Sequence, residues 1–447
     1  MVNRLRTLTG RACIWLTLAP LALGVPQALQ GQANNAFPIS QTHSGKERPL
    51  ADRLPQKPSI PPTLTVPVEP LGFSAPGAIY LGQRNCLVSL DFLDENRLLF
   101  TFRVPGLMHR ETSGEWTDER QIRAVVLELP AGTVAAEALW TVHDRVRYLW
   151  MLKDGHFLLR DKDGVQEGDA NLNLKPLLHF PGPLLWMEMD PSKQYLVTNS
   201  EEPSQTASKP GDVDSPPTAQ ASMTVDGQKF GIPNLVVRIL RIDTGQVILV
   251  SRARAAVHLP INSEGYIESL RGTGEQWILN LDYFTGGSKA LAHVNSSCAP
   301  MASFISAREF LVTSCDRKGA DQITALSTDG RFLWEEAGPS QAIWPLLVMA
   351  PDGSRLVRET LAVNHAINAY AAFDSADVEG QLVRVFDAVT GKVAMVAPAT
   401  PPLDAGGNVA ISPTGQRVAL LNAGALEIFD LPAPPSFADS ANVVAAH

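Results

Sequence analysis

The chain has 447 residues, of which 45% are hydrophobic and 19% charged, and its formal net charge is −9. This composition supports a large core, and 33 Gly with 34 Pro favour many turns over long helices. An acidic chain with no Lys/Arg run repels phosphate backbones, so we expect no nucleic-acid partner.

Residues 1–33 have the pattern of a secretory signal peptide. Arg4, Arg6 and Arg11 precede the apolar stretch CIWLTLAPLALGVP, and small residues favour cleavage after Ala33. A single membrane anchor is the alternative, but two Pro interrupt the stretch and it falls short of about 20 apolar residues. Cleavage removes three Arg and no acid, which changes the charge from −9 to −12. We expect an exported monomer, periplasmic or extracellular, with no membrane span after cleavage.

Composition then divides the mature chain. Residues 34–76 form a Pro-rich stretch that we interpret as a disordered linker. The polar insert 200–226, which has no aromatic residue, and the tail 433–447 are also predicted to be disordered. The ordered body therefore spans residues 77–432.

Within this body, pairs of apolar runs joined by a tight turn recur seven times. They are SLDFLDENRLLFTF, VRYLWMLKDGHFLL, LLWMEMDPSKQYLVT, IESLRGTGEQWILNL, MASFISAREFLVTS, PLLVMAPDGSRLVRE and NVAISPTGQRVALL. Their branched and aromatic residues, bounded by Asp, Gly and Pro, are typical of strand hairpins. The chain thus predicts seven inner hairpins.

A second series of turns alternates with these hairpins: LELPAGTVA, LRDKDGVQ, LRIDTGQVIL, LDYFTGGSKAL, ALSTDGRFLW and VFDAVTGKVAM. Gly245, Gly287 and Gly330 would supply the positive φ that such turns need. Each unit then has four strands in about 46 residues, the size of a propeller blade. The last unit stops after its third strand, and GAIYLGQ (77–83) is expected to supply the fourth.

We therefore predict an all-β fold, a seven-bladed β-propeller of four-stranded antiparallel blades. Eight blades or a twin sandwich are the alternatives. RVFDAVTGKV and LRIDTGQV resemble the outer turn of WD-repeat and YVTN-type bacterial propellers, and VAISPTGQRVAL resembles their inner hairpin. This resemblance covers most of residues 86–431. It implies the architecture and a rigid binding platform, with no specific activity.

Cys298 and Cys315 flank the hairpin FISAREFLV. A turn at Ser306-Ala307 would place the two cysteines opposite each other, and export favours a disulfide between them. Two reduced core thiols are the alternative. Cys86 is left without a partner.

Motifs for cofactor chemistry are weak. ALSTDGRFLWEE and FDAVTGKVAM resemble repeats of pyrroloquinoline-quinone dehydrogenases, in which a Trp docks one blade on the next; here only Trp334 has that place, and no Cys-Cys pair occurs. The nine His residues form no metal-binding spacing, and no nucleophile elbow is found. The Asp pairs in DKDG fit solvated turn charges better than calcium. We expect no cofactor and no metal.

Three long insertions follow second strands, at 103–120, 200–232 and 360–380, and would open on one face. Long loops on a rigid scaffold are common binding sites. The predicted binding residues on these loops are Leu107, Met108, His109, Trp116, His365, Tyr370 and Phe373. Alternatively, these loops fold over the central channel and bury their own aromatic side chains as a lid.

The leading hypothesis is an exported, non-catalytic binding module whose insertion face binds a protein, peptide or glycan. The second is an enzyme with a channel-centred site, either a quinone-dependent oxidoreductase or a lyase or hydrolase acting on sugars. Such a site needs carboxylates or His on first strands, and Glu188 and Asp190 are candidates, although turn capping explains Asp190 more simply. The third hypothesis is that the propeller is only a structural spacer on the cell surface.

Overall fold

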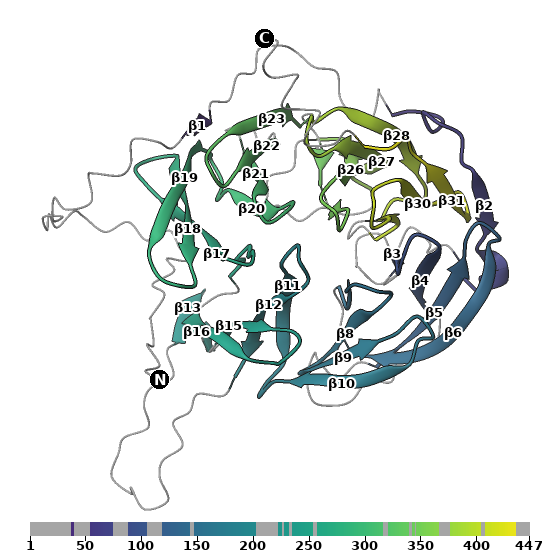
Figure 1. Cartoon of the computed structure of the whole chain (residues 1–447), viewed down its shortest axis with the longest axis horizontal. Coiled ribbons are helices and arrows are strands. Elements are labelled where there is room, and N and C mark those ends of the chain that lie inside the picture. The colour runs from purple at the N-terminus through teal and green to yellow at the C-terminus, as the bar shows by residue number, and fades with distance from the viewer. Residues whose placement is uncertain are drawn as a thin grey trace, which may run out of the picture.

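The apolar runs form β-strands that pair into seven sheets, arranged as the blades of a ring (Figure 1). This confirms the seven-bladed β-propeller. The computed structural model describes residues 54–74, 88–104, 119–143, 147–202, 235–253, 257–315, 321–338, 342–344, 346–365, 376–403 and 407–434, with the strand backbones at 37–39, 222–225 and 228–231.

Blades 1 to 3 each contain four antiparallel strands, and a separate hairpin lies between the second and third strands of blade 3. The strands are β3 (Ser89–Phe92), β4 (Arg97–Arg103), β5 (Arg120–Glu128) and β6 (Thr133–Val142) in blade 1; β7 (Leu149–Met151), β8 (Phe157–Asp161), β9 (Gly164–Gly168) and β10 (Leu174–His179) in blade 2; and β11 (Leu184–Met189), β12 (Tyr195–Glu201), β15 (Leu235–Arg241) and β16 (Val247–Ala253) in blade 3, with the hairpin β13 (Ser222–Val225) and β14 (Gln228–Gly231).

Blades 4 to 7 complete the ring, and two of them recruit a strand from the N-terminal region. The strands are β17 (Gly265–Arg271), β18 (Gln276–Tyr283), β19 (Ser288–Asn295) and the parallel β1 (Phe37–Ile39) in blade 4; β20 (Met301–Phe304), β21 (Glu309–Cys315), β22 (Asp321–Ser327) and β23 (Phe332–Ala337) in blade 5; β24 (Ala342–Ile343), β25 (Leu347–Met349), β26 (Arg355–Val363), β27 (Val378–Asp387) and β28 (Val393–Ala399) in blade 6; and β29 (Val409–Ile411), β30 (Arg417–Asn422), β31 (Ala425–Asp430) and β2 (Leu64–Pro67) in blade 7.

The ring closes through residues 54–74, which we call the strap. Its strand β2 pairs with β31 and is the outer strand of blade 7. The prediction that residues 77–83 supply this strand is therefore wrong; those residues lie outside the described part of the chain. The strap runs along the rim, in purple near β28 and β31 in Figure 1.

The strap is packed, which corrects the interpretation of residues 34–76 as a linker throughout. Val66, Val68, Leu71 and Phe73 are buried between blades 7 and 1, and a short 3₁₀ helix, Glu69–Leu71, lies among them. Alternating apolar residues between the prolines are enough to fill this joint. The predicted disordered insert, tail and signal peptide fall mainly or wholly outside the described residues.

Two predicted turns have a different place in their blade. LRDKDGVQ joins the second and third strands of blade 2, β8 and β9, and not the third and fourth. In blade 4 the predicted inner hairpin IESLRGTGEQWILNL instead joins β17 to β18, the second and third strands. The inner hairpin is made by residues 259–267, where the Ile267 N–H donates to the Pro260 carbonyl at 2.9 Å. The predicted positive φ is confirmed at Gly245, Gly287 and Gly330, with values of 64°, 87° and 93°.

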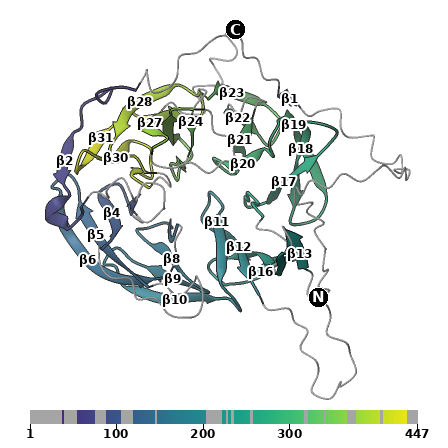
Figure 2. The same cartoon turned by 180° about the vertical axis from the view of Figure 1, so that it is seen from behind.

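The core is divided among the joints of the ring. Each of the seven main apolar clusters lies between two neighbouring blades. A blade therefore buries both of its faces, which is why its strands are apolar in long runs as well as in alternation. First strands such as β11 and β20 lie nearest the ring axis in both views (Figures 1 and 2).

Trp334 docks blade 5 on blade 6, as its place in the repeat predicts. Its Nε1–H donates to the Ala388 carbonyl at 2.7 Å, and its ring stacks on Phe386. The ring also covers Gly391 in the turn between β27 and β28. A Cβ at Gly391, whose φ is +68°, would lie 2.7 Å from the Trp334 ring. The joint thus requires glycine for its conformation and for its size.

We expect Gly391→Ala to destabilise the fold by about 1–3 kcal/mol more than Gly424→Ala, measured by urea unfolding. Gly424 is the matched control because its φ is also positive, at +80°, but nothing lies within 4 Å of its Cβ position. Equal losses in the two variants would show that Trp334 does not press on the turn.

Glu359 in β26 is fully buried between blades 6 and 7. Burial raises the pKa of this carboxyl to about 8, although the N–H groups of Gly407 and Asn408 oppose the rise. In the unfolded chain the same carboxyl has its ordinary pKa of about 4.5. The protonated Glu359 carboxyl therefore makes its full contribution to stability below pH 4.5, and this contribution is lost as the pH rises towards 8.

Glu359→Gln removes this titration while keeping the shape of the side chain. Between pH 5 and pH 8 we expect the unfolding free energy of Glu359→Gln to gain on that of the wild type by up to about 1.4 kcal/mol per pH unit. Urea unfolding at four pH values measures the difference. A difference that does not change with pH would contradict the assignment.

Candidate functional site

The three long insertions leave the ring at one end. They connect β4 to β5, β12 to β15 and β26 to β27, which are the second and third strands of blades 1, 3 and 6. Because equivalent strands of the blades run in the same direction, these connections share a face, which we call the insertion face. The prediction that all three insertions follow second strands is confirmed.

Six of the seven predicted binding residues lie in parts of the chain that the structure does not describe. Leu107, Met108, His109, Trp116, Tyr370 and Phe373 lie outside the described residues. His365 is described and exposed. Its Nδ1 lies 2.5 Å from Oδ1 of Asn364 and 3.7 Å from Oδ1 of Asp377, so it sits where the chain leaves β26.

Polar networks hold the bases of the insertions. In blade 3, Arg238 on β15 pairs with Glu202, which also accepts a hydrogen bond from Ser200 at 2.8 Å. In blade 1, Arg120 donates to the His143 carbonyl at 3.3 Å, and Nδ1 of His143 lies 3.0 Å from Asp161 on β8. The insertions therefore begin from fixed points on the rigid strands.

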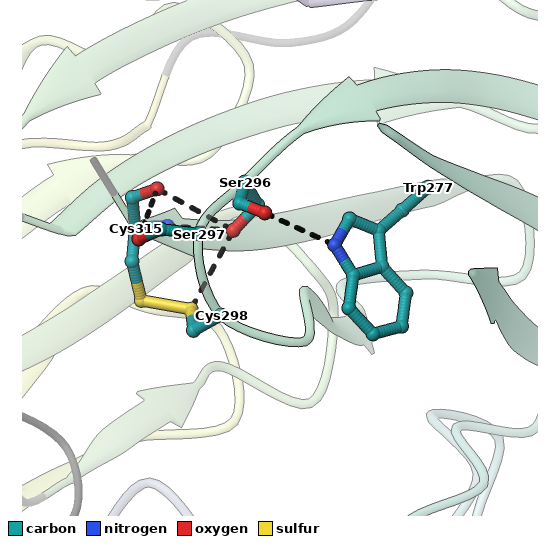
Figure 3. The surroundings of a disulfide bond; sticks show 5 residues. All are labelled: Trp277, Ser296, Ser297, Cys298 and Cys315. Atoms are coloured by element: carbon teal, nitrogen blue, oxygen red, sulfur yellow. Dashed lines mark hydrogen bonds between the residues drawn. A yellow bond between two sulfur atoms is a disulfide. The ribbon is translucent and has the colours of Figure 1, made fainter. Parts of the chain in front are cut away.

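The disulfide between Cys298 and Cys315 is confirmed (Figure 3). It ties the connection after β19 to the end of β21, and so links blade 4 to blade 5. Ser296 reinforces the link, because its hydroxyl accepts the Cys315 N–H at 3.0 Å and its carbonyl accepts Nε1–H of Trp277 at 3.1 Å. The predicted register is wrong by one residue: Ser303 pairs with Leu311, and Cys298 lies outside the ladder.

A second group of residues meets at the ring axis. Five ionisable side chains come from the inner parts of blades 1 to 4, and we call them the axial cluster: Asp91, Arg147, Glu188, Lys193 and His258. Side chains alternate along a strand, so Asp91 shares a face of β3 with Ser89 while Leu90 and Phe92 are buried. Glu188 shares a face of β11 with Trp186 in the same way.

His258 joins three blades. Its Nδ1 lies 3.0 Å from Oε2 of Glu188 in blade 3, and its Nε2 lies 2.9 Å from the Ala302 carbonyl in blade 5. Burial opposes the charged ring, but the hydrogen bond and the charge of Glu188 outweigh it and raise the pKa of His258. Both ring nitrogens face acceptors, so the imidazolium form satisfies both bonds at once.

The other three members are charged groups in partly desolvated surroundings. Burial raises the pKa of Asp91 to about 6, although the charges of Arg147 and Lys193 and the hydrogen bond from Ser89 lower it. Burial, and then the charge of Arg147, lower the pKa of Lys193 to about 8. Burial lowers the pKa of Arg147 although its side chain reaches solvent, because atoms of neighbouring blades surround the guanidinium.

Of the two carboxylates named from the sequence, Glu188 joins this cluster, whereas Asp190 acts on Lys193 through its charge and is itself held as a turn cap. Asp190 caps its turn by accepting the N–H groups of Ser192, Gln194 and Tyr195 at 2.7–2.9 Å. Sequence analysis missed Asp91, Arg147, Lys193 and His258. The available signal was a charged residue inside the first apolar run of a hairpin, as in SLDFL.

Within the described residues, no three His, Cys, Asp or Glu side chains are grouped as a metal site requires. The described part of the chain also forms no helix with the length and apolarity needed to cross a membrane.

No protein-family model and no curated protein matches the chain. Among solved structures, it is similar to the uncomplexed acylaminoacyl peptidase of Pyrococcus horikoshii, at 11% identity and a TM-score of 0.45, over 79% of this chain and 52% of the peptidase. The chain thus spans about half the length of that enzyme.

Two further similar structures are Sqt1 of Chaetomium thermophilum bound to the N-terminus of ribosomal protein L10 and TolB of Acinetobacter baumannii. Sqt1 has 11% identity and a TM-score of 0.41, over 78% of this chain and 98% of Sqt1. TolB has 13% identity and a TM-score of 0.35, over 74% and 77%. The fold rests on the strand pairing of this chain, which forms a seven-bladed β-propeller.

The Glu188–His258 pair makes a prediction about pH. Because the folded pKa of His258 is raised, its contribution to stability is complete below pH 6.5 and is lost as the pH rises through the folded value. We expect His258→Gln to cost about 0.5–1 kcal/mol at pH 6, since the pair is partly exposed, and less at pH 9. Urea unfolding at both pH values measures the cost, and Glu188→Gln should reproduce it. A cost that grows with pH would contradict the pairing.

Proposed function

We propose that this protein is an exported, non-catalytic binding module whose insertion face holds a protein, peptide or glycan partner. The observation that carries this proposal is the placement of the three long insertions on one face, each starting from a fixed strand end. Their sequences carry Trp116, Tyr370 and Phe373, which are side chains that anchor interfaces. The signal-peptide pattern of residues 1–33 supports export.

The geometry of His258 favours a role in linking blades over a role as a general base. A general base needs a nitrogen that a substrate proton can reach. In His258 one ring nitrogen faces Glu188 and the other faces the Ala302 carbonyl, so the ring links blades and offers no free nitrogen. An enzyme of the quinoprotein or sugar-cleaving kind is the alternative, and Asp91, Glu188 and His258 at the ring axis are the described residues that it would use.

The test is recovery of a partner from the extracytoplasmic fraction with the tagged chain. We expect Trp116→Ala with Tyr370→Ala to reduce recovery of the partner by about tenfold or more, because aromatic anchors dominate interface energies. The melting temperature should stay unchanged. Replacing residues 107–118 by Gly/Ser should have the same effect.

Val134→Ala with Leu139→Ala is the matched control, because it also removes two exposed apolar side chains, from β6 at the rim. It should leave recovery unchanged. A large fall in melting temperature for the Trp116/Tyr370 variant would instead show that the insertions bury their aromatics as a lid.

Sequencing the N-terminus of the exported protein should find Asn34.

A further inference from the structure

Extended segments of the N-terminal region cover the outer edges of three blades. β1 lies along β19 in blade 4, and β2 lies along β31 in blade 7. In blade 6, the Ser59 N–H donates to the Val396 carbonyl at 2.7 Å, and the Ser59 hydroxyl accepts the Val396 N–H at 2.9 Å. The backbone groups on the outer side of β28 are therefore used at Val396.

Charged residues or proline protect the outer edges of blades 1, 2 and 5. An uncovered edge strand offers N–H and C=O groups to other chains, and charges or proline in the strand oppose such pairing. Glu137 in β6 and Glu335 in β23 hold the same place, two residues after the β-bulge of their strand. In blade 2, β10 contains Lys175 and Pro176. These three edges are guarded without being covered.

β16 in blade 3 has neither kind of protection at the equivalent place. Val250 lies two residues after the bulge of β16, as Val396 does in β28, and each valine lies opposite an arginine, Arg238 or Arg384. Because the N–H and C=O of Val396 point outward to Ser59, those of Val250 point outward too. Within the described residues, β16 pairs only with β15, and the hairpin of β13 and β14 forms a sheet of its own.

This edge is also apolar. β16 carries three of the nine large apolar side chains that are exposed in the described chain: Val247 at 45%, Ile248 at 37% and Val250 at 41%. No charge and no proline occurs from Val247 to Ser251. Leu249 packs inward on the core, which holds the strand in place. A chain laid along β16 would bury the exposed side chains and bond the outward N–H and C=O of Val250.

We propose that the edge of β16 at Val250 binds an extended, uncharged, proline-containing peptide segment of a partner protein, as β28 binds Ser59. The segments that already cover an edge have this character: Phe37–Ile39, residues 58–62 and Leu64–Pro67 are uncharged, and each contains proline. Proline suits a segment that bonds on one side only, because it lacks an N–H and favours extended backbone. This site lies on the rim and does not rest on the partner proposed for the insertion face.

A fluorescein-labelled peptide PSIPPTLTVP, the sequence of residues 58–67, tests the site on the full chain. Fluorescence anisotropy at protein concentrations up to about 1 mM should detect its binding. The chain's own strap is tethered, so the free peptide should not replace it on blades 6 and 7. Val250→Glu gives β16 the charge that Glu137 and Glu335 give their strands, and it should weaken binding at least several-fold.

Leu139→Glu is the matched control, because it adds the same charge to an exposed apolar residue of another outer strand, β6. It should leave binding unchanged, and both variants should keep their melting temperature. Hydrogen exchange of the wild type locates the site without any variant: the peptide should slow exchange in residues 247–253 and leave 393–399 unchanged. No binding, equal binding to Val250→Glu, or changed exchange at 393–399 in place of 247–253 would overturn the proposal.

Discussion

Closure of the ring is the constraint on which the rest of this structure depends. A blade buries both faces only when a neighbour packs on each, so an open joint would expose two apolar surfaces. The strap closes the joint between blades 7 and 1: β2 adds the last strand, and Val66 and Phe73 fill the space behind it. The bond from the Thr63 hydroxyl to the Ile428 carbonyl links residues 365 positions apart. Closure is therefore a contact between the two ends of the folded chain.

The same geometry explains why charges gather at the axis. A first strand has no further strand on its inner side, so its polar side chains reach solvent there even though its blade faces are buried. Convergence of the blades then brings neighbouring atoms close and desolvates these groups in part. Partly desolvated acids and bases keep their charges only when they lie near each other. The charge of Arg147 therefore opposes the raised pKa of Asp91, and the charge of Asp91 opposes the lowered pKa of Arg147. His258 carries the arrangement further, since its two bonds join blades 3, 4 and 5.

What the sequence predicts well is local. A turn with positive φ at Gly245 or Gly330 needs only its own residues, and Trp334 docks on the next blade along the chain. The strap was missed because its partner, β31, lies at the far end of the chain and its prolines resemble those of a linker. In blade 4, Pro260 conceals the first strand, so the hairpin was assigned one strand too late. The axial cluster was found only at Glu188, because its members meet from four blades and share no spacing.

The insertion face and the axial cluster draw on different parts of the blade, and this separates their chemistry. The insertions extend from second and third strands, so their length and sequence can vary without altering any joint of the ring. The axial residues lie on or beside first strands, and Trp186 and Met187 lie on the same short β11 that carries Glu188. A change at the axis is therefore also a change in blade packing, whereas a change on the insertion face is not. The ring thus combines insertions that can change without altering its joints with a charged centre whose residues are constrained by the fold itself.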